Sequence, residues 1–91
     1  MPKKLTTKEV KTLLKQVPGW QLKQKEIARQ YTFSGFVTAM AFVNHVAGLA
    51  EAMDHHPEIL IQYKKVKLTL STHSAGGLTE LDFKLAKNID A

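Results

Sequence analysis

Apolar residues recur at helical spacing in the first segment of the chain, LTTKEVKTLLKQV, residues 5–17. The spacing i, i+3, i+4, i+7 predicts an amphipathic helix whose inner face is formed by Val10, Leu13, Leu14 and Val17. Thr6 and Glu9 stand three residues apart, as in a capping box that closes the start of a helix. The pair Pro18 and Gly19 then ends the helical pattern.

Two further helices follow from the same periodicity. The first, residues 36–53, should end near Asp54 or His55, because Pro57 disfavours helical backbone at His56. Ser34 is expected to cap its start. Its broad apolar face is predicted to consist of Phe36, Val37, Met40, Ala41, Val43, Ala47 and Ala50. The other helix, residues 78–89, should turn inward Leu78, Leu81, Leu85 and Ile89.

Between the helices, apolar and polar residues alternate with the period of two that is typical of half-buried strands. One strand pair is predicted over residues 20–22 and 26–33, with a turn at 23–25. A second pair is predicted over residues 57–63 and 65–73, with its turn at Lys64 and Lys65. Strands joined by short turns are antiparallel. The order α-β-β-α-β-β-α therefore predicts a single α+β domain, residues 1–91, in which a four-stranded antiparallel sheet carries three helices on one face.

The length and net charge of the chain indicate where the protein is found and which partners it has. The chain has 91 residues, no cysteine and a net charge of +5. It contains no run of 18 apolar residues and no signal peptide, so we expect a cytoplasmic protein with no membrane partner. A domain this short is marginally stable alone, which favours a homo-oligomer. The lysines are spread over all predicted elements and Arg29 is the only arginine, so we expect a solvated surface and no nucleic-acid partner.

Ionisable residues gather around the end of the second predicted helix. Glu51, Asp54, His55 and His56 fall within six residues, and His73 closes the last predicted strand before a glycine-containing loop. Asp82 lies beside the apolar face of the last helix, where a carboxylate needs a partner. His45, in contrast, lies in mid-helix beside Asn44 and is interpreted as a structural or surface residue.

Three kinds of chemistry can be weighed for this set. A metal site of Glu51, His55, His56 and His73 is conceivable, but the spacing matches no metal motif. A serine nucleophile beside His73 lacks any triad or nucleophile elbow. What remains is a group of histidines with flanking carboxylates, which is suited to general acid–base catalysis. Elimination, hydration or tautomerisation would need no cofactor.

The chain resembles the pterin-4a-carbinolamine dehydratase family over essentially its whole length. The motifs are PGW after the first helix, LTLSTHSAGGLTELD at residues 68–82, and the spaced set Glu51, His55, His56, Pro57, Tyr63, His73 and Asp82. The resemblance implies that a 4a-hydroxytetrahydropterin loses water to give the quinonoid dihydropterin, with no cofactor and no metal. It also implies a homodimer or homotetramer. The alternative is a binding module without enzymatic activity, since some animal members serve as dimerisation partners of a transcription factor.

The resemblance also implies roles for individual residues. His55 and His73 become the leading acid–base pair, and His56 positions the pterin or takes part in proton transfer. Glu51 and Asp82 would orient the histidines from behind. The pterin site would be lined by Asp54, His55, His56, Ser71, Thr72, His73 and Ser74.

Overall fold

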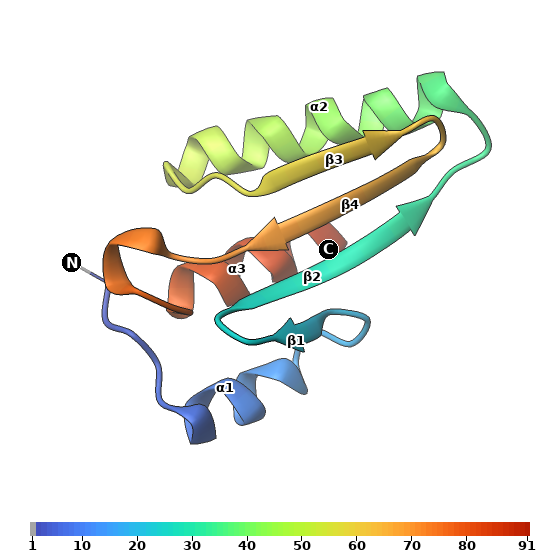
Figure 1. Ribbon diagram of the computed structural model, residues 1–91. Coiled ribbons are helices and arrows are strands. Elements are labelled where there is room, and N and C mark those ends of the chain that lie inside the picture. The colour runs from blue at the N-terminus through green and yellow to red at the C-terminus, as the bar shows by residue number, and fades with distance from the viewer. Residues whose placement is uncertain (1) are drawn as a thin grey trace.

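The computed structural model describes residues 2–91 and gives the element order α-β-β-α-β-β-α, with one additional turn of 3₁₀-helix, η1, before the last helix. The elements are α1 (Thr7–Leu14), β1 (Gln21–Lys23), β2 (Glu26–Thr32), α2 (Phe36–Met53), β3 (Glu58–Gln62), β4 (Lys65–Leu70), η1 (His73–Ala75) and α3 (Glu80–Asp90). The four strands form one sheet in the order β1-β2-β4-β3, and every neighbouring pair is antiparallel (Figure 1). The predicted fold class is confirmed.

The inner face of the sheet follows the predicted alternation. On β4, Val66, Leu68 and Leu70 are buried, whereas Lys67 and Thr69 between them are partly exposed on the opposite face. The register places Leu70 opposite Ile27 of β2, and Leu68 opposite Ile59 of β3. In Figure 1, α2 and α3 lie behind the sheet and α1 lies beside β1. Val10 of α1 and Leu85 of α3 belong to the same hydrophobic core.

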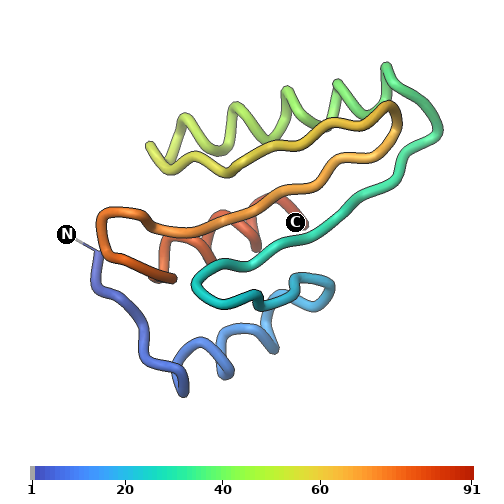
Figure 2. Tube along the Cα trace, in the orientation of Figure 1, coloured from blue at the N-terminus to red at the C-terminus, as the bar shows by residue number. Residues whose placement is uncertain are grey.

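The start of α1 has the predicted capping box. The Thr6 hydroxyl accepts a hydrogen bond from the Glu9 backbone N–H at 3.2 Å, and the Glu9 carboxylate accepts one from the Thr6 N–H at 2.8 Å. The preceding segment lies beside the loop before α3, as the Cα trace in Figure 2 shows, and the Leu5 N–H donates to the Leu78 carbonyl at 2.8 Å. The N-terminal segment is thereby tied to the end of the molecule that carries α3.

The predicted inner face of α2 was largely wrong. Its buried residues are Ala39, Val46 and Ala50, whereas Phe36 is 50% exposed and Val37 is 82% exposed. Apolar residues occur around most of this helix, so the periodicity did not select one face. By length and composition alone α2 could cross a membrane, but the core helix of a soluble protein passes the same test.

The start of α2 and the second turn also differ from the prediction. Gly35, not Ser34, is the N-cap residue, and the Ser34 hydroxyl lies 3.2 Å from that of Thr38. The turn between β3 and β4 is formed by Tyr63 and Lys64, one residue earlier than predicted, and Tyr63 adopts a positive φ of 54°. The sequence does not specify the position of this turn, because it contains neither the glycine nor the asparagine that is typical of tight hairpin turns.

Arg29 stands between Ile27 and Tyr31, two residues of β2 that contact the hydrophobic core, and a polar cluster at the end of α3 matches its charge. The Asp90 carboxylate accepts hydrogen bonds from Trp20 Nε1–H at 2.8 Å, Arg29 at 3.0 Å and the Tyr31 hydroxyl at 2.6 Å. The guanidinium also lies over the Tyr31 ring, 4.8 Å from its centroid. Burial, and secondly the bond to Asp90, raise the pKa of Tyr31. This cluster fastens the last turn of α3 to the sheet.

Candidate active site

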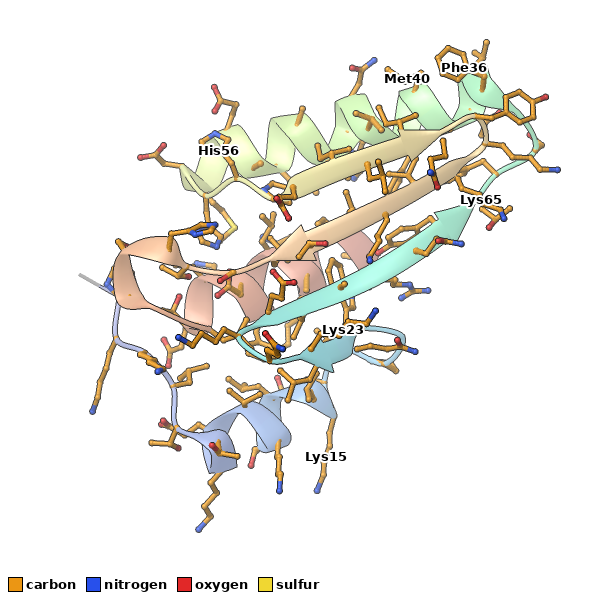
Figure 3. The ribbon with its side chains drawn as sticks, viewed as in Figure 1. Lys15, Lys23, Phe36, Met40, His56 and Lys65 are labelled. Carbon is orange, nitrogen blue, oxygen red and sulfur yellow. The ribbon has the colours of Figure 1, made fainter. Side chains whose placement is uncertain are left out.

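The end of α2 places the two adjacent histidines in different environments. The helix ends at Met53, and Asp54 adopts the left-handed conformation with φ 50° and ψ 44°. The His55 N–H still reaches back to the Ala50 carbonyl at 3.1 Å. After this reversal His55 is buried and His56 is exposed. Figure 3 shows His56 at the end of α2, beside the start of β3. Asp54 itself, predicted to line a ligand site, is exposed at the turn.

His55 pairs with Asp82 inside the protein. Its Nε2 lies 2.6 Å from Asp82 Oδ1, and the two side chains are 10% and 0% exposed. A carboxylate can only accept hydrogen bonds, so the hydrogen in this contact belongs to Nε2 of the imidazole. The ring orientation of His55 is thus set by a buried carboxylate that lies 27 residues away along the chain.

Asp82 is held in turn by the first turn of α3. Its Oδ2 accepts the Thr79 backbone N–H at 2.9 Å and the Thr72 hydroxyl at 2.9 Å. Thr79 is the N-cap of α3, and Asp82 completes its capping box. A negative charge is favoured at this position, because the positive end of the helix dipole lies there. The contacts offset the cost of burying the carboxylate.

His56 and Glu51 form a second imidazole–carboxylate pair. His56 Nε2 lies 2.5 Å from Glu51 Oε2, and the side chains are 56% and 76% exposed. Both residues lie at the end of α2, so this pair is local in the chain. Water competes with it and salt screens it, and it constrains His56 far less than Asp82 constrains His55.

His73 lies at the start of η1, directly after Thr72, and its side chain is exposed. Thr72 forms an isolated bridge with Gly77, so the intervening residues make a tight loop that Gly76 closes with a φ of 74°. Ser71 is half-buried and Ser74 is exposed in the same segment. The end of β4, this loop, the start of α3 and the end of α2 all lie at one end of the molecule (Figure 1).

Eight of the nine predicted site residues form two pairs and the segment of Ser71, Thr72, His73 and Ser74. The ninth, Asp54, is exposed at the turn after α2. His55 with Asp82 and His56 with Glu51 form the pairs, and Thr72 joins the first pair through its hydroxyl. Within residues 2–91 the structure gathers no group of three or more His, Cys, Asp or Glu that could hold a metal ion.

Thr79 was missed by the sequence analysis, although its side chain is fully buried and bonded to Thr72 at 2.8 Å between hydroxyl oxygens. The available signal was the pattern TELD at residues 79–82, a threonine followed three residues later by a carboxylate. The same pattern had predicted the start of α1.

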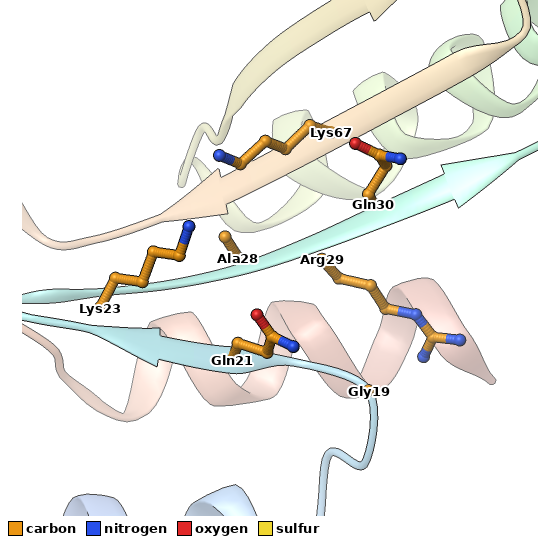
Figure 4. A pocket seen from close by; sticks show the side chains of 7 residues that line it. All are labelled: Gly19, Gln21, Lys23, Ala28, Arg29, Gln30 and Lys67. Atoms are coloured by element: carbon orange, nitrogen blue, oxygen red, sulfur yellow. The ribbon is translucent and has the colours of Figure 1, made fainter.

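A hollow on the open face of the sheet has a different character. It is lined by Gly19, Gln21, Lys23, Ala28, Arg29, Gln30 and Lys67, whose cationic and amide side chains Figure 4 shows. The residues lining this hollow include neither a histidine nor a carboxylate. Such a surface lacks the groups for acid–base catalysis near neutral pH, which the end of the molecule with His55 and His73 provides.

The family model described as pterin 4 alpha carbinolamine dehydratase matches residues 3–91. The chain belongs to this family. It is 54% identical over 87 residues to a protein of Acidobacterium capsulatum that is provisionally named a pterin-4-alpha-carbinolamine dehydratase, with 96% of this chain and 95% of that protein covered. A protein of Chloroflexus aurantiacus with the same provisional name is 52% identical over 90 residues, covering 99% and 96% of the two chains.

A solved structure agrees with this assignment. The crystal structure of a protein of Brucella melitensis, described as a transcriptional coactivator/pterin dehydratase, superposes with a TM-score of 0.92 at 40% identity and covers 97% of this chain and 96% of that one. The chain is accordingly an enzyme of the hydro-lyase class, a pterin carbinolamine dehydratase.

Proposed function

We propose that the chain removes water from a 4a-hydroxytetrahydropterin by histidine acid–base catalysis. The hydroxyl at C4a leaves as water after accepting a proton, the proton on N5 is removed, and a C4a–N5 double bond forms, giving the quinonoid dihydropterin. One acid and one base are sufficient, so the cycle needs no cofactor. The observation that carries this proposal is the buried His55–Asp82 pair, in which an imidazole is held by a carboxylate at 2.6 Å.

His55 and His73 are the proposed acid–base pair. Support comes from their positions: Asp82 bonds both to His55 and to Thr72, the residue before His73. His56 is proposed to position the pterin or share in proton transfer, with Glu51 orienting it. Asp54, Ser71, Thr72 and Ser74 are the proposed lining residues, together with the three histidines.

The test is dehydration kinetics with a defined 4a-hydroxytetrahydropterin. His55→Gln and His73→Gln should each slow dehydration about tenfold or more, because a general acid or base contributes about 10²–10⁴-fold. Glutamine retains an N–H donor, and His55→Gln should therefore remain folded against Asp82. His45→Gln, on the exposed middle of α2, is the matched control and should leave the rate unchanged. Unchanged rates in both site variants would contradict the acid–base assignment.

We also propose that the active form is a homodimer or homotetramer. Its support is the apolar surface that the single chain leaves exposed on α2 and β3, where Val37 is 82% and Leu60 is 51% exposed. Sedimentation equilibrium at micromolar concentration measures the state directly. A monomer across that range would contradict the proposal.

A small-molecule pterin, and no nucleic acid, is the proposed ligand. In Figure 3, Lys15 follows α1, Lys23 lies on β1 and Lys65 lies on β4, so cationic side chains occur on several elements. Retention of DNA at about 0.2 M salt without pterin binding would favour the alternative, a binding module.

A further inference from the structure

Two threonine hydroxyls are buried behind the His55–Asp82 pair. Thr72 is 5% exposed and Thr79 is fully buried, and their hydroxyl oxygens lie 2.8 Å apart. A helix cap explains part of the role of Thr79, but Thr72 caps no helix with its side chain. A buried hydroxyl destabilises the folded protein unless it is hydrogen-bonded, so each of these two hydroxyls needs a partner.

The direction of each hydrogen bond in this group follows from the number of hydrogens. The Thr72 hydroxyl donates its single hydrogen to Asp82 Oδ2, which as a carboxylate oxygen only accepts. The contact between the two hydroxyls therefore requires Thr79 to donate to Thr72. The Thr79 oxygen in turn accepts the Leu81 backbone N–H at 3.3 Å. The hydrogens thus run in one direction, from Thr79 through Thr72 to Asp82.

This series of hydrogen bonds leaves one oxygen of the Asp82 carboxylate for His55. Oδ2 of Asp82 is occupied by two donors, the Thr72 hydroxyl and the Thr79 N–H, while Oδ1 faces His55 Nε2. Asp82 can then neither rotate freely nor offer Oδ2 to the imidazole. His55 is held with a hydrogen on Nε2, and Nδ1 is the nitrogen that remains for a ligand.

We propose that Thr72 and Thr79 are positioning residues that lock Asp82, and through it keep the His55 proton on Nε2, so that Nδ1 exchanges the proton with the pterin. The part that concerns the pterin rests on the proposed function. The resemblance implies only that Thr72 lines the pterin site, whereas its hydroxyl is bonded to Asp82. Thr79 acquires a role that the family pattern did not assign to it.

Thr72→Val is the decisive variant, because valine keeps the shape and removes only the hydroxyl. The backbone at Thr72 is held separately, by hydrogen bonds to Gly77 of 3.0 and 3.4 Å, so the loop should keep its conformation. ¹⁵N NMR of the His55 ring in the ligand-free protein should show the hydrogen partly moved to Nδ1. The kcat for dehydration should fall about three- to tenfold, the loss expected for one hydrogen bond, with KM nearly unchanged.

Serine variants test rescue. Thr72→Ser and Thr79→Ser keep a hydroxyl and should restore both the Nε2–H form and kcat to near the wild-type values. Thr79→Val should repeat the defect of Thr72→Val, with an added loss of stability from the missing cap.

Two control variants separate positioning from stability. Thr6→Val removes the equivalent cap of α1, whose hydroxyl bonds Glu9, and should lower stability without changing the His55 ring or kcat. Thr69→Val makes the matched substitution on the open face of β4 and should change none of these quantities.

The outcomes are distinguishable. If Thr72→Val leaves both the His55 hydrogen on Nε2 and kcat unchanged, or if serine fails to restore them, the positioning role is wrong. If the NMR changes occur as expected while the wild-type protein dehydrates no pterin, the hydrogen-bond assignment is supported and the proposed function is overturned.

Discussion

Two helices of this molecule begin with the same local motif, and only one of them contributes to the candidate site. In α1, Thr6 and Glu9 bond to each other's backbone at 3.2 and 2.8 Å. In α3, the Thr79 hydroxyl accepts the Leu81 N–H at 3.3 Å, and Asp82 accepts the Thr79 N–H at 2.9 Å. Glu9 is exposed, whereas Asp82 is fully buried.

The difference shows what tertiary contacts add to a capping box. Glu9 bonds only to the helix start, where water can replace it. Asp82 uses one oxygen for the cap and the Thr72 hydroxyl, and its other oxygen for His55. A single carboxylate therefore closes α3 and orients an imidazole. In a buried network, each member depends on the others for its hydrogen bonds.

The largest expected effect is that of Asp82→Ala on the free energy of unfolding. Removing this carboxylate leaves His55, the Thr72 hydroxyl and the Thr79 N–H without their acceptor, and losing one partner of a buried pair costs about 3–5 kcal/mol. Glu9→Ala, the matched change in α1, should cost far less, because the Glu9 carboxylate is exposed and water can take its place at the helix start. Urea unfolding followed by the fluorescence of Trp20 measures both. Equal losses would mean that the two capping boxes are energetically equivalent.

Asp82→Asn should have a smaller effect on stability and a clear effect on the rate. The two donors at the Oδ2 position should draw the amide oxygen, which turns the NH₂ group towards His55. An N–H donor there favours the imidazole with its hydrogen on Nδ1, the wrong nitrogen in the proposed mechanism. The rate of dehydration should fall about tenfold or more.

Glu9→Gln is the control for that substitution and should leave the rate unchanged. The two variants make the same chemical change in the two boxes. An Asp82→Asn protein that dehydrates pterin at the wild-type rate would show that the His55 tautomer does not matter for catalysis.

Much of the fold follows from local patterns. Alternation along β4 and the helical spacing of α1 and α3 predicted the right elements, because burial of one face is visible in the sequence. The face of α2 was not predictable in this way, since its apolar residues leave several faces equally suitable. Packing of α2 against α3 and β4 buries Ala39, Val46 and Ala50.

The sequence indicated which residues belong to the candidate site, but not which of them bond to one another. Sequence spacing indicated that Asp82 needs a partner, and only the folded chain shows that the partner is His55 rather than His56 or His73. Thr79 escaped notice because a threonine at a helix start has a sufficient local explanation. Its contact with Thr72 depends on the loop that brings the end of β4 to the start of α3.

The smallest expected effect is the pH dependence that Glu9 adds to stability. A hydrogen bond from the Thr6 backbone N–H to the Glu9 carboxylate lowers the pKa of Glu9 below its ordinary value of 4.5. The side chain of Thr6 contributes secondly, in the same direction. The folded protein therefore holds a proton on Glu9 less tightly than the unfolded chain does. This contribution is fully present above about pH 4.5 and is lost as the pH falls through the lower pKa of the folded state.

Comparing wild type with Glu9→Gln isolates the contribution of the Glu9 charge to the free energy of unfolding. Wild type should be the more stable of the two at pH 7, and the difference should shrink as the pH falls below about 4.5, where protonated Glu9 resembles glutamine. Urea unfolding at a series of pH values measures the difference. If the difference in free energy of unfolding stays constant from pH 7 to pH 3, the charge of Glu9 contributes nothing to the cap of α1. The capping box of α1 would then differ from that of α3, in which we expect the carboxylate of Asp82 to be essential.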